Sequence, residues 1–194
     1  MSFTDPSKTT ILVHEFFWFR LMKGYYRKLV RSLDLRCDER VLDFGCGPGA
    51  ASKFIALTLE KGEGELTCFD ISEKWIERAK KNLSQFSNVE YYAVDIREWD
   101  ERNEYYDTVV IHFMLHDIPQ SERPEIIKVL IQKMKAGATL IIREPAKEGH
   151  GILPEEIQKL MKTNGMTEIV SGFAKRTLMG KYYTGFYRKT LENM

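Results

Sequence analysis

The fold of this chain is narrowed first by a short apolar segment that runs directly into a glycine-rich turn. Residues 41–44 read Val-Leu-Asp-Phe, and Gly45, Gly47 and Gly49 follow before Ala50 opens a helical pattern. A strand, a glycine turn and a helix in this order are typical of an α/β protein whose backbone comes close to a ligand. Glycine lacks the Cβ that would hold the ligand away, and it tolerates the backbone angles of a tight turn.

The unusual residue of this segment is Asp43, which lies inside the expected strand two positions before the first glycine. A loop that binds only phosphates gains nothing from a negative charge there, whereas a positively charged ligand is attracted by it. S-adenosylmethionine has an ammonium group, a sulfonium group and no phosphate. Asp43 is therefore the first indication that the chain holds this cofactor.

Composition limits the remaining function classes. The 194 residues fit one domain, and 29 basic residues against 28 acidic ones argue against a surface built for nucleic acid. No apolar run approaches the roughly 20 residues that cross a bilayer, and no secretory leader opens the chain, so we expect a cytoplasmic protein without membrane insertion. The three cysteines lack metal-site spacing, and no metal is expected.

The hydrophobic pattern predicts alternating strands and helices after an N-terminal helical segment. Strands are expected at residues 41–44, 65–69, 89–94, 108–113 and 139–142, with helices at 50–60, after Ser72, at about 126–137 and at 154–165. Such alternation implies a doubly wound, mostly parallel sheet of the α/β class. The last two strands, at 167–170 and 181–188, are too close for a crossover helix and should pair antiparallel.

We expect a single domain over residues 1–194, in which residues 1–36 form a helical lid or cap and residues 37–194 form the cofactor-binding core. The aromatic cluster at residues 16–19 would pack as core or close over the pocket, because Glu15 and Arg20 interrupt the apolar run.

Acidic residues recur at the carboxyl ends of the first three expected strands. Asp43 lies within the first strand, Asp70 follows the second and Asp95 follows the third. Ligands of open α/β sheets bind outside these strand ends. Asp70 stands 21 residues beyond Gly49 (70 − 49), where a carboxylate commonly binds a ribose diol, and Asp95 would accept a hydrogen bond from an adenine amine.

These residues resemble the class I S-adenosylmethionine-dependent methyltransferases. The stretch 43–49 matches the acidic-x-Gly-x-Gly-x-Gly signature of that family, and the likeness extends over roughly residues 38–189. It implies a seven-stranded sheet with an antiparallel last strand. It also implies that Asp43 and the glycine turn hold the methionine end of the cofactor, Asp70 the ribose, and Asp95 and Ile96 the adenine. The cofactor-binding residues so expected are Asp43, Phe44, Gly45, Cys46, Gly47, Gly49, Asp70, Ile71, Asp95, Ile96 and His112.

The expected reaction is methyl transfer from S-adenosylmethionine to a small molecule, leaving S-adenosylhomocysteine. His116 is the first candidate for a general base and Glu144 the second. The Asp/Asn-Pro-Pro-aromatic element of nucleic-acid amino-methyltransferases is absent after residue 111, which favours a small acceptor over nucleic acid. The identity of the acceptor, the atom that is methylated and the oligomeric state stay open.

Three alternatives remain at this point. The acceptor could be a protein, or the chain could bind the cofactor without performing chemistry. A nicotinamide-dependent dehydrogenase is also compatible with the glycines, since Gly45-x-Gly47-x-x-Ala50 satisfies the dinucleotide fingerprint. The carboxylates at 43 and 95 and the helices before the first strand favour the methyl donor.

Overall fold

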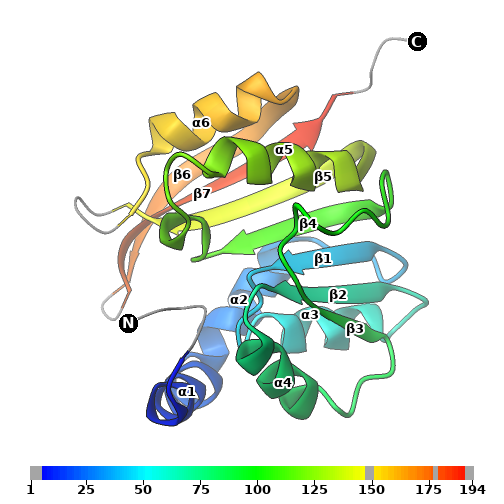
Figure 1. Cartoon of the computed structure of the whole chain (residues 1–194), viewed down its shortest axis with the longest axis vertical. Helices are drawn as coiled ribbons and strands as arrows, with labels where there is room; N and C mark the ends of the chain where they lie inside the picture. The colour runs from blue at the N-terminus through cyan, green and yellow to red at the C-terminus, as the bar shows by residue number, and fades with distance from the viewer. Residues whose placement is uncertain (1–5, 147–150, 177–178, 191–194) are drawn as a thin grey trace. The chain divides into compact units, whose positions relative to one another are not determined.

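The structure, a computed structural model, describes residues 6–146, 151–176 and 179–190. The chain divides into two compact units, Met1–Asp95 and Ile96–Met194. Within the described residues, seven strands belong to one mixed, mostly parallel sheet (Figure 1). The predicted fold class, including its antiparallel C-terminal strands, is confirmed.

The first unit contributes three parallel strands and the helices that precede and connect them. In order these are α1 (Lys8–Glu15), a π-helical turn (Phe16–Leu21), α2 (Lys23–Ser32), β1 (Arg40–Phe44), α3 (Ser52–Leu59), β2 (Glu65–Asp70), α4 (Glu73–Asn82) and β3 (Val89–Ala93). Strand β2 lies between β1 and β3 and is parallel to both. Four of the five β1 residues are buried, as expected of a parallel strand that is covered on both faces.

Helix α4 begins where the sequence predicts. The side chain of Ser72 accepts a hydrogen bond from the backbone N–H of Trp75 at 3.4 Å, and Glu73 occupies the first turn. Both features stabilise a helix N-terminus. Trp75, Ile76 and Ala79 then form its buried stripe.

The described residues of the second unit form four strands and two helices. These are β4 (Tyr106–His112), a 3₁₀ turn (Leu115–Asp117), α5 (Arg123–Lys133), β5 (Met134–Pro145), α6 (Pro154–Thr163), β6 (Met166–Arg176) and β7 (Gly180–Lys189). Strand β5 is parallel to β4 and antiparallel to β7, and β7 is antiparallel to β6. Helices α5 and α6 pack against each other, α5 against β5 and α6 against β6, on one face of these strands (Figure 1).

A glycine in β7 leaves room for the two tyrosines that flank it on the same face of the strand to contact each other. A Cβ at Gly185 would meet the ring of Tyr187 at 2.5 Å and the hydroxyl of Tyr183 at 3.0 Å. The two tyrosine hydroxyls are 2.6 Å apart and buried. Position 185 therefore admits no side chain while the tyrosines keep this arrangement.

Several element boundaries differ from the predicted ones. Helix α3 begins at Ser52 rather than at residue 50, strand β5 begins at Met134 rather than at residue 139, and strand β6 extends to Arg176 rather than to residue 170. Gly137 does not end a helix: α5 ends at Lys133, and Gly137 lies inside β5 with φ +76°. The reason is that Met134 already pairs with Tyr106, and the irregular register that follows absorbs the residues around the glycine.

The third glycine of the turn provides a test of the first unit. Gly49 has φ +86°, and a Cβ there would lie 3.0 Å from Cδ1 of Leu83. We predict that Gly49→Ala lowers the free energy of unfolding by roughly 1–3 kcal/mol through backbone strain and crowding. The matched control is Gly24→Ala in α2, where nothing lies within 4 Å; it should stabilise by about 0.5–1 kcal/mol. Urea unfolding measures both, and equal effects would contradict the prediction.

Candidate active site

The glycine turn joins β1 to α3 through three residues in left-handed backbone conformations. Gly45, Gly47 and Gly49 have φ values of +75°, +52° and +86°, which only glycine adopts without cost. The backbone N–H groups of Gly45 and Cys46 donate to the carbonyl of Phe69 at 2.8 and 3.1 Å. These bonds fix the turn to the end of β2.

Asp43 is buried at the end of β1, with 2% of its surface exposed. The hydroxyl of Ser52, in the first turn of α3, donates to its Oδ2 at 2.6 Å. Burial raises the pKa of Asp43 from 3.8 to about 6; the Ser52 bond opposes this shift, and the charge of Asp70 adds to it.

Asp70 ends β2 and ties two backbone segments together. Its Oδ2 accepts the N–H of Gly47 at 3.0 Å, and its Oδ1 accepts the N–H of Ser72 at 2.9 Å. Burial raises its pKa to about 6, although the two backbone donors oppose the shift. Asp70 thus closes the glycine turn onto the start of α4.

Both carboxylates lack a cationic partner among the described residues. The groups that donate to them are a hydroxyl and two backbone amides, all of them neutral. A buried carboxylate that stays charged normally pairs with a cation. Burial raises the pKa values of Asp43 and Asp70, and no cation among the described residues offsets the shift.

The other predicted cofactor residues lie as follows. Phe44 and Cys46 are buried beside the turn, Ile71 is 55% exposed, and Asp95 is half-buried two residues beyond β3. Burial, with Cys68 beside it, raises the pKa of the Cys46 thiol, which therefore stays neutral. Ile96 and His112 belong to the second unit. The cofactor-binding roles of these residues stay predictions.

A clamp between α1 and the glycine turn is not among the features that the sequence predicts. The carboxylate of Glu15 accepts hydrogen bonds from Arg78 and from Asn82 of α4, the latter at 2.9 Å. The same Asn82 amide donates to the carbonyl of Pro48 at 3.0 Å. Partial burial raises the pKa of Glu15, but the hydrogen bonds from Arg78 and Asn82 have a larger opposite effect, so the pKa is lowered overall. One signal was present: Glu15 is a lone acid in an apolar run.

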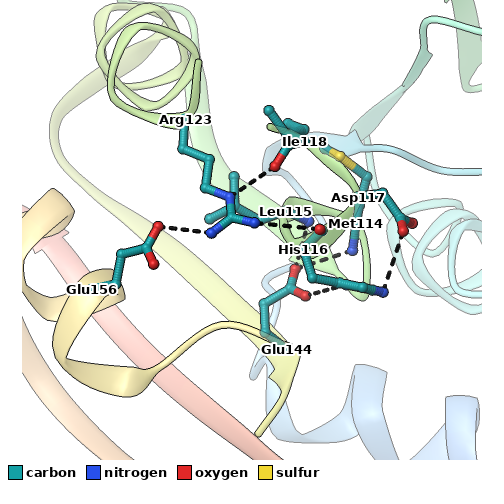
Figure 2. A network of polar contacts seen from close by, with 8 residues as sticks. All are labelled: Met114, Leu115, His116, Asp117, Ile118, Arg123, Glu144 and Glu156. Carbon is teal, nitrogen blue, oxygen red and sulfur yellow. Dashed lines mark hydrogen bonds and ion pairs between the residues drawn. The ribbon is translucent and has the colours of Figure 1, made fainter. Parts of the chain in front are cut away.

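In the second unit, the side chain of Glu144 organises the segment after β4. It is fully buried, and its Oε1 accepts the N–H groups of Met114 and Leu115 at 3.0 and 2.7 Å. The Nδ1 of His116 donates to Oε2 at 2.7 Å. Figure 2 shows the carboxylate directed at these backbone amides and at the imidazole. The structure thus brings together the two residues that were predicted to be catalytic.

His116 is held between two carboxylates. Its Nε2 lies 3.6 Å from Oδ1 of Asp117, on the side opposite Glu144. Burial lowers the pKa of His116, but the hydrogen bond and charge of Glu144 outweigh burial and raise it above 6.5. The pair therefore favours the protonated imidazolium, with Glu144 fixing the orientation of the ring.

Arg123 supports this turn from α5. Its guanidinium donates to the carbonyls of Ile118 and His116 at 2.9 and 3.3 Å, and to Glu156 of α6 at 2.8 Å (Figure 2). A single side chain therefore connects both helices to the 3₁₀ turn. Neither Arg123 nor Glu156 had been singled out from the sequence, because no local pattern indicates their partner.

His112, at the end of β4, differs from His116. Burial, with the positive charge of Arg143 on the neighbouring strand, lowers its pKa to about 3. His112 is therefore neutral near pH 7, and its ring lies 4.5 Å from that of Phe113. Phe113 itself has φ +52°, a strained conformation for a bulky residue.

The described residues contain no group of three or more His, Cys, Asp or Glu residues placed to hold a metal ion. Among the same residues, no helix combines the length and the apolar character needed to cross a bilayer.

Residues 41–137 match the family described as "Methyltransferase domain", a span that includes the glycine turn, Asp70, Asp95 and His116. The chain belongs to this methyltransferase-domain family.

Solved structures share the fold. The N-methyltransferase NodS of Bradyrhizobium japonicum, solved with S-adenosyl-L-homocysteine, aligns with a TM-score of 0.73 and 19% identity over 88% of each chain. Magnesium protoporphyrin IX methyltransferase of Synechocystis aligns at 0.69 and 19% identity, over 96% of this chain and 86% of that one. The [4+2]-cyclase SpnF aligns at 0.74 and 14% identity, over 88% and 81%.

Two relatives with similar sequences are longer proteins. Prosolanapyrone synthase of Alternaria solani is 31% identical over 69% of this chain and 6% of its own length. Carboxy-S-adenosyl-L-methionine synthase of a Shewanella species is 26% identical over 68% of this chain and 56% of its own. The matched region is thus about half of the second protein and a small part of the first.

Because the pKa of Asp43 is raised in the folded chain, replacing its carboxyl with a neutral group should stabilise the fold in a pH-dependent way. Protonation of Asp43 contributes stability that is fully present below pH 3.8 and is lost as pH rises through about 6. We expect Asp43→Asn to gain up to about 3 kcal/mol relative to the unsubstituted protein between pH 4 and pH 7. Urea unfolding across this range is the measurement. Asp38→Asn, on the exposed surface, is the control, and a pH-independent difference would refute the assignment.

The Glu15 clamp makes a separate prediction. Glu15→Ala removes the acceptor for Arg78 and Asn82, so α1 should detach locally while the strands stay folded. Chymotrypsin should then cut the aromatic segment 16–19 several-fold faster, with little change in Tm. Glu60→Ala, at an exposed position, should leave the cleavage rate unchanged. An unaltered rate in the Glu15 variant would show that the clamp does not hold the helix.

Proposed function

We propose that this protein transfers a methyl group from S-adenosylmethionine to a small-molecule acceptor. The observation that carries the proposal is the pair of buried carboxylates, Asp43 and Asp70, at the carboxyl ends of adjacent parallel strands without a cation beside them. Membership of the methyltransferase-domain family supports it, as does the fold shared with NodS, which was solved with S-adenosyl-L-homocysteine.

The chemistry of the two carboxylates fits the cofactor. S-adenosylmethionine carries positive charge and sugar hydroxyls; a buried carboxylate without a cationic partner can pair with the first and accept hydrogen bonds from the second. In the proposed arrangement, Asp43 and the glycine turn bind the methionine end of the cofactor, and Asp70 binds the ribose hydroxyls. Asp95 and Ile96 bind the adenine. When bound, the cofactor supplies an activated methyl group.

The protein's own contribution to the reaction would be positioning and exclusion of water. Aligned reactants gain roughly 7–11 kcal/mol over free ones. We propose that residues 1–36 act as the lid, with the Glu15 clamp as the contact that seats α1 against α4 and the turn. The core would then be residues 37–194, as one domain.

The proposed role of Glu144 is to position His116, and that of His116 is to accept a proton from the acceptor. The raised pKa of His116 sets a condition on this role, because the neutral imidazole becomes available only as pH rises. A base of this kind would give a rate that increases with pH and levels off once His116 is deprotonated.

Binding of S-adenosylhomocysteine, which keeps the ammonium group, tests the cofactor site by calorimetry. Asp43→Asn and Asp70→Asn should each weaken binding about tenfold or more through loss of a charged partner, whereas Asp38→Asn should not. Affinity should rise between pH 5 and pH 7, because Asp43 must lose a proton to pair with the ammonium group and Asp70 must lose a proton to accept charge-assisted hydrogen bonds from the ribose hydroxyls. Binding of NAD in place of the homocysteine ligand would favour the dehydrogenase.

Turnover with methyl-labelled S-adenosylmethionine then tests the reaction. Label should appear in the low-molecular-weight fraction of a cell extract. Label in protein would favour the protein acceptor, and binding without transfer to either fraction would favour a non-catalytic module.

A further inference from the structure

The outward side of the N-terminal helical segment is apolar. Leu12, Val13 and Phe16 are 63%, 61% and 59% exposed, and Leu21 at the end of the π-helical turn is 59% exposed. A helix on a protein surface ordinarily directs its apolar side chains to the core and its polar ones to water. These four residues, called the apolar stripe below, do the opposite. Apolar groups that gather on one exposed element mark a contact surface.

The orientation of α1 is fixed by its other side. Ile11 is 8% exposed, and Glu15 accepts hydrogen bonds from Arg78 and from Asn82 of α4, the latter at 2.9 Å. Positions 11 and 15 are four residues apart and therefore lie on the same face of the helix. The carboxylate that interrupts the apolar run in the sequence is thus turned toward α4, and the apolar stripe is left to the solvent.

Helix α2 presents a basic surface. Its tyrosine, leucine and valine side chains are buried, and the helix contains no acidic residue. Positions 23, 27 and 31 recur every four residues and so lie along one side of the helix. The exposed cations of α2 are Lys23, Arg27, Lys28 and Arg31.

Positive charge is concentrated in this segment of the chain. Residues 8–32 contain six basic residues and one acidic residue, a net charge of +5 (6 − 1). The other residues contain 23 basic and 27 acidic ones, a net charge of −4 (23 − 27). The overall charge of +1 therefore conceals a strongly basic segment, to which an anionic partner is attracted.

The apolar stripe and the cations of α2 meet at the π-helical turn, within the first unit. Arg20, Leu21 and Lys23 are all exposed there, and the rings of Trp18 in the turn and Tyr26 in α2 pack edge-on with centres 6.0 Å apart. Figure 1 shows the two helices in blue. Exposed apolar side chains beside a row of cations are typical of segments that lie in the interfacial region of an anionic bilayer.

We infer that residues 8–32 dock on an anionic lipid bilayer, with the apolar stripe entering the headgroup region and the cations of α2 contacting the anionic headgroups. Such a contact stays within the interface and needs no membrane-spanning helix. A nucleic acid would use the cations and leave the apolar stripe without a role. A second copy of this chain would bring two basic segments together, and their like charges repel. The inference does not rest on the proposed function.

Sedimentation of the full chain with lipid vesicles tests this inference. Binding to vesicles of equal parts phosphatidylcholine and phosphatidylglycerol should be about tenfold or more tighter than to phosphatidylcholine alone, and it should weaken as salt is added. Arg27→Gln combined with Lys28→Gln should weaken binding to the mixed vesicles about tenfold or more. Leu12→Gln should weaken it about threefold or more, because less apolar surface enters the interface.

The matched controls lie in the second unit. Lys159→Gln combined with Lys162→Gln removes the same charge from exposed positions of α6, and Leu153→Gln replaces a leucine that is 64% exposed, against 63% for Leu12. Both controls should leave binding unchanged, and Tm of each variant establishes that it is folded.

Three outcomes would overturn the inference: no binding to either kind of vesicle, equal binding to both, or unchanged binding in the α2 charge variant or in Leu12→Gln. A loss confined to the charge variant would indicate a general polyanion surface instead of a membrane contact.

Discussion

The interaction on which the candidate cofactor site depends is the double hydrogen bond that Asp70 accepts from the backbone of Gly47 and of Ser72. It joins the turn after β1 to the start of α4 through a single side chain at the end of β2. A neutral residue could satisfy one amide but not both with equal strength. The carboxylate therefore has a structural task even before a ligand arrives, and its raised pKa shows that the folded chain leaves its charge poorly compensated.

Much of this arrangement is predictable from the sequence because it is local. Apolar segments predict the strands, a helix is expected directly after Ser72, and the three glycines predict the turn after β1. What failed depends on long-range pairing: Gly137 has the composition of a helix end, yet ladder pairing between Met134 and Tyr106 draws it into a strand. The partners of Glu15 lie 63 and 67 positions away, and no periodicity in a single sequence reports such contacts.

Fold and activity separate in this group of proteins. A [4+2]-cyclase aligns with this chain as well as the N-methyltransferase NodS does, so the sheet and its helices do not by themselves determine the reaction. The distinction must come from residues outside the glycine turn. In this chain two such residues, one after β4 and one in β5, differ in their surroundings. His116 lies between the carboxylates of Glu144 and Asp117, whereas the guanidinium of Arg143 lies over the ring of Tyr182.

The shared amide of Asn82 has an evolutionary consequence. Because one nitrogen serves both the Glu15 carboxylate and the Pro48 carbonyl, a change at position 82 alters the anchoring of the first helix and the loop geometry together. Homologous chains should therefore exchange the residues at positions 15, 78 and 82 as a set, and lineages that have discarded the first helix should be released from this covariation.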